Sequence, residues 1–148
     1  MRPEPVPAGD LWAALGKRYP RASNGVRLED PDYDPLSDGD LARVSRLLRR
    51  TLLFQSVLLL RPMWVWTGRF DCEDYARLAA CCASAWHAAS GGPGSAPAFG
   101  TLRYEREDGG HTLNVVLTLS GLREWEPQRR GFADLSLEER MTATSVLF

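Results

Sequence analysis

The hydrophobic pattern predicts a long amphipathic helix in the first half of the chain. Apolar side chains recur three or four residues apart at Leu41, Val44 and Leu48, which places them on one face of a helix. Ser37 and Asp40 have the spacing of a capping box, with aspartate in the usual glutamate position. The helix is therefore expected to begin at Ser37.

A second helix is predicted from Cys72 to about Ala89. Asp71 is a good N-cap residue, and alanine-rich apolar positions follow at helical spacing. Two shorter helices are expected, one capped by Asp10 and one from Ser136 to Arg140. Residues 1–9 carry three prolines and are interpreted as an exposed tail, residues 21–36 as a loop, and residues 10–148 as a single domain.

Strand patterns dominate the chain after residue 98. Alternating apolar residues separated by glycine-containing turns predict antiparallel strands over 99–105, 111–119 and 122–126. Residues 141–148 are expected to form a last strand, with helix as an alternative. Helices followed by antiparallel strands indicate an α+β fold.

Composition and charge exclude several classes of protein. The formal net charge of the 148 residues is -1, so no basic field favours nucleic acid as a partner. The longest apolar run, 51–60, is shorter than the roughly 20 residues that span a bilayer. Three cysteines, two of them adjacent, predict free thiols and a reducing, cytoplasmic location. A secreted or virion-associated protein remains an alternative, and the oligomeric state does not follow from the sequence.

Cys72 is the leading candidate for a reactive group. The start of a helix favours thiolate over thiol, and thiolate is the nucleophile. His111 follows a Gly-Gly turn at the start of a strand, and Glu126 ends the next strand. A thiol, an imidazole and a carboxylate in this order are what nucleophilic acyl chemistry needs, with His111 as base and Glu126 as the group that orients it. The alternative is that Cys72 is simply a small buried residue.

Other side chains compete for these roles or extend the site. Glu124 has the same strand parity as Glu126 and is a rival third member. His87 lies about 22 Å from Cys72 along the same helix and cannot reach it, so it is interpreted as a surface or groove residue. Trp66 is expected to line the cleft beside Cys72, and Asn114 and Gln128 are candidate hydrogen-bond donors in that cleft.

Glu73 and Asp74 directly follow Cys72 and have two interpretations. Carboxylates in the first turn of a helix complement its dipole. They are also hard oxygen ligands suited to calcium, provided that other oxygens converge on them.

Three short motifs carry a resemblance to a known family. Phe70-Asp71-Cys72-Glu73-Asp74-Tyr75-Ala76, Gly110-His111-Thr112-Leu113-Asn114 and Trp125-Glu126-Pro127-Gln128 resemble the papain-like domain at the carboxyl end of the Marasmius oreades agglutinin and related small bacterial and phage proteins. The segment 32–37 is similar to one that these small proteins carry.

The resemblance implies a papain-like cysteine peptidase with a Cys72-His111-Glu126 triad, a peptide or protein substrate and dependence on calcium or a similar divalent ion. It places metal ligands near Glu73 and Asp74. It does not include the agglutinin's β-trefoil sugar-binding domain, so lectin activity is not implied.

Two classes of function follow. One is a thiol hydrolase that cleaves a peptide or amide bond through an acyl-enzyme, with transfer to an amine as a variant. The alternative is a catalytically silent binding module of the same fold in a phage or cell-surface assembly. The papain pattern has a glutamine before the nucleophile that donates to the oxyanion, whereas this chain has Val65 and Trp66 there, which favours the binding module.

Overall fold

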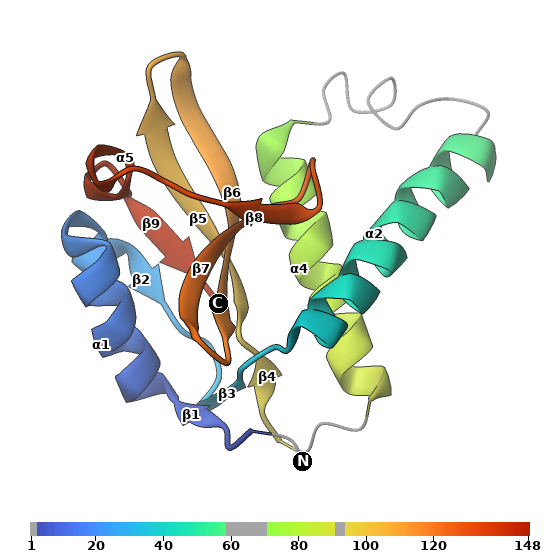
Figure 1. The fold of residues 1–148 in the computed structure, drawn as a ribbon, viewed down its shortest axis with the longest axis horizontal. Helices are drawn as coiled ribbons and strands as arrows, with labels where there is room; N and C mark the ends of the chain where they lie inside the picture. The colour runs from blue at the N-terminus through green and yellow to red at the C-terminus, as the bar shows by residue number, and fades with distance from the viewer. Residues whose placement is uncertain (1–2, 59–70, 91–93) are drawn as a thin grey trace.

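The protein is an α+β molecule in which helices flank a mixed β-sheet (Figure 1). The computed structural model describes residues 3–58, 71–90 and 94–148. Its elements in chain order are β1 (Val6–Pro7), α1 (Ala8–Arg18), the 3-10 helix η1 (Pro20–Gly25), β2 (Val26–Arg27), β3 (Asp32–Asp34), α2 (Asp38–Leu58), α4 (Cys72–Ala89), β4 (Ala96–Pro97), β5 (Phe99–Arg106), β6 (Gly109–Thr118), β7 (Gly121–Glu126), β8 (Gly131–Ala133), α5 (Leu137–Met141) and β9 (Ser145–Leu147).

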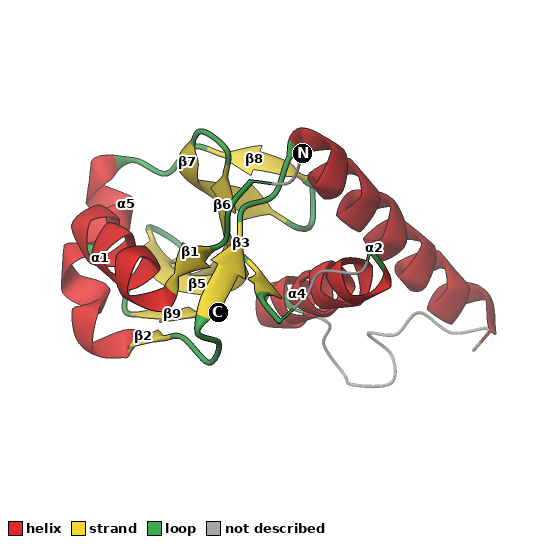
Figure 2. Cartoon of the chain, turned by 90° about the horizontal axis from the view of Figure 1, so that it is seen from below, coloured by secondary structure: helices red, strands yellow, loops and turns green. Residues whose placement is uncertain are grey.

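The main sheet has six strands in the order β2-β9-β5-β6-β7-β8. The β5–β6 and β6–β7 pairs are antiparallel, as the sequence predicts. The β9–β5 and β7–β8 pairs, which the sequence did not predict, are also antiparallel, whereas β2 pairs with β9 in parallel. A small sheet, β1-β3-β4, lies at one end of the molecule (Figure 1). Figure 2 shows α1 and α5 on one side of the strands and α2 and α4 on the other. Within residues 3–58, 71–90 and 94–148, the helices lack the length and apolar character that a membrane-spanning helix needs.

Strand β6 is the centre of the core because both of its faces are covered. Every side chain from His111 to Val116 is buried, and the strand pairs with β5 on one side and β7 on the other. A strand that alternates apolar and polar residues usually has one solvated face. Here the residues of the more polar face, Thr112 and Asn114, lie under α4 instead.

Helix α4 begins as the sequence predicts. The Asp71 carboxylate accepts hydrogen bonds from the backbone N–H groups of Glu73 and Asp74, and the Asp74 carboxylate accepts one from the Asp71 N–H. This reciprocal capping box fixes Cys72 as the first residue of the helix. The box predicted at Ser37 and Asp40 is also present at the start of α2.

The structure of the N-terminal segment differs from the sequence prediction in three places. Helix α1 begins at Ala8 rather than after Asp10, because the extended Pro7 ends β1 and the Ala8 N–H donates to the carbonyl of Pro31. Val6 and Pro7 pair with β3 rather than forming a free tail. The expected loop at 21–36 contains η1, β2 and β3, which are too short to show a periodic pattern.

A buried ionic network ties α1 to the sheet. Arg18 donates two hydrogen bonds to the Glu124 carboxylate, at 3.1 and 2.7 Å, and the Tyr19 hydroxyl donates a third at 2.8 Å. Arg140 lies 3.3 Å from the same carboxylate. Burial alone raises the pKa of Glu124, but the hydrogen bonds from Arg18 and Tyr19 outweigh it and hold the pKa below its usual range.

We expect Glu124→Gln to lower the free energy of unfolding at pH 7 by about 2 to 3 kcal/mol, because it leaves Arg18 without its charged partner. The folded-state pKa lies below the unfolded value, so this stabilisation is present above about pH 4.3 and is lost as pH falls through the folded pKa. Urea unfolding at pH 7 and at pH 3 measures it. A variant that loses as much stability at pH 3 as at pH 7 would contradict the electrostatic account, and exposed Glu138→Gln is the control.

Candidate functional site

Three predicted site residues come from elements that meet at one end of the sheet. Helix α4 and strand β6 both begin at this end, and β7 finishes there (Figure 1). The Asn114 amide donates to the carbonyl of Ala76 at 2.9 Å, which fixes α4 against β6. Thr112 lines a groove together with Glu73 and Arg77, so the first turns of α4 lie beside the first residues of β6.

His111 and Glu126 form a buried pair. The His111 Nε2 atom lies 2.8 Å from Glu126 Oε2, and both side chains are less than 10% exposed. The Gln128 backbone N–H donates to the other carboxylate oxygen at 3.3 Å. Burial raises the pKa of Glu126, but the hydrogen bonds from His111 and Gln128 outweigh it and lower the pKa below its usual range. The sequence interpretation of Glu126 as the group that orients His111 fits this geometry.

Cys72 is half-buried at the start of α4. Among the described residues its thiol makes no hydrogen bond with His111. Strand geometry gives the reason, because successive side chains point to opposite faces. Thr112 and Asn114 face α4, so His111 points to the other face, where it packs edge-on against Tyr104 at 5.7 Å. The structure thus pairs His111 with Glu126, and the part that the predicted triad assigns to Cys72 stays a prediction.

The three residues predicted to line the cleft differ in burial and in contacts. Asn114 is fully buried and donates to the carbonyls of Ala76 and Gly100, so it holds α4 to the sheet and is not open to a ligand. Gln128 is exposed, and its contact with the pair is through its backbone. Trp66 lies outside the described residues.

Glu73 and Asp74 are both engaged within α4. Glu73 pairs with Arg77 one turn later, and Asp74 completes the capping box with Asp71. In the described part of the chain, no group of three or more acidic, histidine or cysteine side chains is arranged to hold a metal ion. The residues as placed do not form a calcium site, and the calcium expectation stays a prediction, which calorimetric titration with calcium chloride tests.

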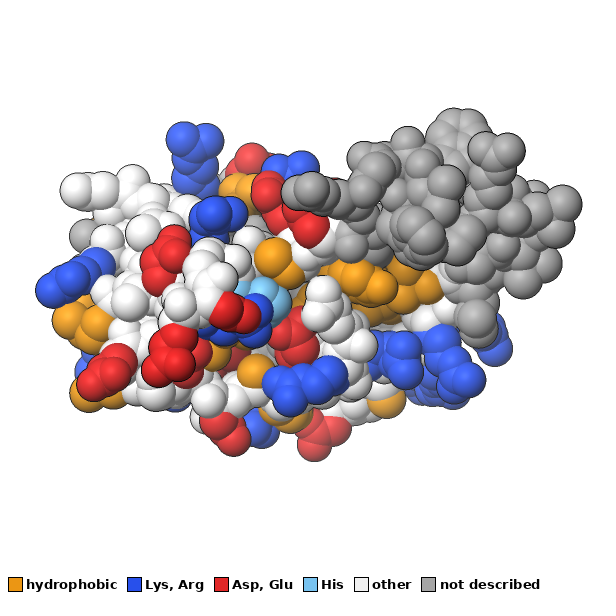
Figure 3. Space-filling view, turned by 90° about the horizontal axis from the view of Figure 1, so that it is seen from above, with side chains coloured by type: hydrophobic (Ala, Val, Ile, Leu, Met, Phe, Trp, Pro, Cys, Tyr) orange, Lys and Arg blue, Asp and Glu red, His pale blue; other side chains and the backbone are white. Residues whose placement is uncertain are grey.

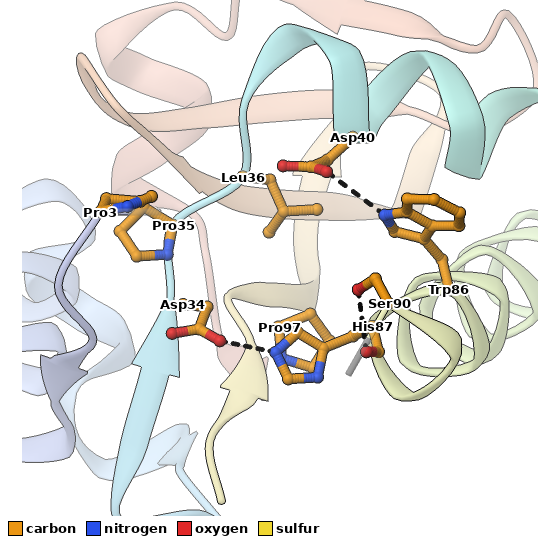
Figure 4. A pocket seen from close by; sticks show the side chains of 9 residues that line it. All are labelled: Pro3, Asp34, Pro35, Leu36, Asp40, Trp86, His87, Ser90 and Pro97. Carbon is orange, nitrogen blue, oxygen red and sulfur yellow. Dashed lines mark hydrogen bonds and ion pairs between the residues drawn. The ribbon is translucent and has the colours of Figure 1, made fainter. Parts of the chain in front are cut away.

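The rival residues have structural partners. Glu124 belongs to the network with Arg18 and does not reach His111. His87 lies at the far end of α4, where its Nε2 atom is 2.6 Å from Asp34 Oδ2 and the Ser95 hydroxyl donates to the same oxygen at 2.7 Å. Figure 4 shows this pair in a small pocket, with the Trp86 indole directed at Asp40.

A long groove beside α4 was not anticipated from the sequence. We call it the α4–β9 groove; it has a volume of about 900 Å³ and runs between α4, β5 and β9. Its residues come from five separate segments, which no single sequence motif brings together. Those used below are Arg27, Glu29, Glu73, Arg77, Ser84, Phe99, Thr101, Arg103, Ser145, Leu147 and Phe148.

Figure 3 shows the molecule from the end at which α4 and β6 begin. Acidic, basic and hydrophobic side chains lie around a histidine near the middle of this face, and the largest group of basic side chains is at its lower right, over α2. The end of the sheet at which α4 and β6 begin is therefore not uniformly charged.

Comparison with known proteins gives a fold relationship only. No protein-family model matches the chain, and no curated protein matches it. Among solved structures, a Polyporus squamosus lectin bound to the epitope Neu5Aca2-6Galb1-4GlcNAc superposes with a TM-score of 0.67 at 18% identity, covering 97% of this chain. A PSL1a-E64 complex gives a TM-score of 0.70 at 16% identity and the same coverage. This chain spans about half of each of those chains, 49% and 51%.

These neighbours correct one expectation. The sequence resemblance implies a hydrolase and a thiol protease, whereas the first structure is that of a lectin and no family model or curated sequence indicates a protease. The α+β class is confirmed.

We expect Glu126→Gln to lower the free energy of unfolding at pH 7 by about 1 to 2 kcal/mol, because the buried carboxylate loses charge-assisted hydrogen bonds from His111 and Gln128. The depressed pKa makes this contribution fully present above about pH 4.3 and lost as pH falls through the folded pKa. Thermal unfolding between pH 3 and 7 measures it, with exposed Glu105→Gln as control. Equal stability of variant and wild type at pH 7 would show that the pair does not stabilise the fold.

Proposed function

We propose that this chain is a carbohydrate-binding module that holds an acidic oligosaccharide in the α4–β9 groove. The observation that carries the proposal is the composition of the groove. Three arginines, hydroxyl groups and apolar side chains line one open surface on the face of the sheet, together with the carboxylates of Glu29 and Glu73, of which Glu73 is paired with Arg77.

The arginines supply the recognition of charge. Arg27 and Arg103 are exposed, and neither has an ion-pair partner among the described residues. Arg77 is on the opposite wall and pairs with Glu73. Guanidinium groups bind carboxylates through two parallel hydrogen bonds, so the free pair suits a sugar acid.

The groove floor supplies apolar contact. Phe99 packs edge-on against Trp125 at 5.5 Å, and Leu147, which pairs with Thr101, is 44% exposed on the same face. The Phe148 ring lies instead against Gly100, on the opposite face of β5 from Phe99 and Thr101. Hydroxyl groups that can donate and accept surround this floor, from Ser84, Thr101 and Ser145.

An oligosaccharide fits this surface better than a peptide does. Peptides commonly bind by adding a strand to an open sheet edge. The groove lies on the face of β5 and β9, which are inner strands of the six-stranded sheet. Their main-chain groups are already paired, so recognition has to come from side chains.

The structural neighbours support the proposal to a limited extent. One is a lectin bound to Neu5Aca2-6Galb1-4GlcNAc, and its fold extends over nearly all of this chain. Since this chain spans about half of that protein, the sugar specificity proposed here rests on the residues of the groove and not on the ligand of the lectin.

Titration with Neu5Acα2-6Galβ1-4GlcNAc tests the function. We expect saturable binding that Arg103→Ala and Arg27→Ala each weaken at least fivefold, since each removes a charge-assisted contact. Galβ1-4GlcNAc, which lacks the carboxylate, is expected to bind at least fivefold more weakly than the acidic trisaccharide.

Arg49→Ala on the exposed side of α2 is the matched control and is expected to bind as wild type does. Failure of every acidic glycan on an array to bind, or binding that Arg27→Ala and Arg103→Ala leave unchanged, would overturn the proposal. Capture of extended peptides in place of glycans would assign the groove to peptide recognition instead.

A second candidate function is nucleophilic chemistry at Cys72, with His111 as base and Glu126 as the orienting group. The buried His111–Glu126 hydrogen bond favours it. For this chemistry the Cys72 thiol has to come within hydrogen-bond distance of the His111 imidazole.

The rate of Cys72 alkylation by iodoacetamide between pH 4 and 9 tests this candidate. A thiolate paired with an imidazolium is expected to label fast below neutral pH and to lose that reactivity in His111→Ala. Measurements with and without calcium show whether the ion promotes the pairing. An alkylation rate with the pH dependence of an ordinary thiol, unchanged in His111→Ala, would rule out this candidate. The measurement is made with Cys81→Ser and Cys82→Ser, so that only Cys72 can be labelled.

A further inference from the structure

A second groove, on the other side of α2, carries a group of arginines. We call it the α2–β8 groove; its volume is about 560 Å³, and it lies between the first turns of α2, strand β7 and the start of β8. Arg46 contributes from α2, Arg123 from β7 and Arg130 from the turn before β8. Basic side chains over α2 are visible in Figure 3.

These three guanidinium groups have no counter-charge of their own. Within the described ranges none of them is in an ion pair, whereas Arg18, Arg77, Arg106 and Arg140 all are. The groove holds a single carboxylate, from Asp38. Asp38 lies in the first turn of α2, where it complements the helix dipole. Positive charge therefore exceeds negative charge in this groove.

Arg123 is positioned by an aromatic ring. Its guanidinium carbon lies 3.7 Å from the centre of the Phe132 ring. Stacking of this kind holds the planar group in place while leaving its N–H donors free at the edge. Phe132 is 36% exposed, so the ring also offers apolar contact to a ligand.

Arg130 has an unusual backbone. Its φ of 53° makes it the one non-glycine residue with positive φ in the described chain. A side chain in this region costs on the order of 1 kcal/mol, and glycine adopts it freely. Arg130 lines the groove together with Arg46 and Arg123.

We propose that the α2–β8 groove is a binding site for a phosphate or sulfate monoester. Three unpaired guanidinium groups from three elements match the several oxygens of a tetrahedral oxyanion, which arginine binds through paired hydrogen bonds. The Phe132 ring lies where the esterified group would pack. The site is separate from the α4–β9 groove and does not depend on the function proposed there.

Titrations with methyl phosphate and methyl sulfate, followed by NMR shifts of the arginine Nε–H and Trp125 indole signals, test the site at constant ionic strength. We expect saturable binding that Arg123→Gln and Arg130→Gln each weaken at least fivefold. Arg130→Gly is expected to weaken binding equally, because it removes the guanidinium while suiting the backbone. The relative affinity of the two esters shows whether the doubly charged phosphate or the singly charged sulfate is preferred.

Arg49→Gln, on α2 outside the groove, is the matched control and is expected to bind within twofold of wild type. The site is refuted if the shifts follow ionic strength without saturating, or if Arg123→Gln and Arg130→Gly bind as Arg49→Gln does. Circular dichroism of each variant separates loss of binding from loss of fold.

Discussion

The contact between α4 and β6 organises the whole molecule. It depends on Asn114, a fully buried amide that donates to the Ala76 carbonyl on the helix and the Gly100 carbonyl on β5. Because a buried polar group without partners is costly, these bonds fix both the distance and the register of the helix. The small side chains Ala76 and Ala79, both fully buried, let the helix come close to the sheet. Cys72 and the α4–β9 groove take their positions from this packing.

Two charged networks lie on the other face of the same sheet. Glu124 and Glu126 are two residues apart on β7, so they share a face, yet they serve different partners. Glu124 joins Arg18 and Tyr19 from the α1 segment, and Glu126 joins His111 from β6. Opposite-charge and hydrogen-bonding partners keep both carboxylates ionised although they are buried. The Glu124 and Glu126 networks do not by themselves assign a function to this face of the sheet, because buried networks of this kind also stabilise folds.

The arginines of this chain divide by environment. Some are neutralised inside the fold, as Arg18 is, while others line open grooves without a counter-charge. A net charge close to zero conceals this separation. The two grooves differ in what surrounds the guanidinium groups, with hydroxyls, carboxylates and apolar side chains beside α4 and a single stacked ring beside β8. This difference is why we infer distinct ligands for them.

The sequence by itself determined the elements whose signals are local. The capping boxes at Ser37 and Asp71, the helical period of α2 and the turns of the β5–β6–β7 meander act over a few residues, so they could be read directly. It also indicated the pairing of His111 with Glu126, since adjacent strands of a meander bring their ends together. Tertiary structure alone decided which face each side chain occupies. Helix α4 covers the Asn114 face, His111 lies on the Tyr104 face with Glu126, and both grooves combine segments far apart in the chain.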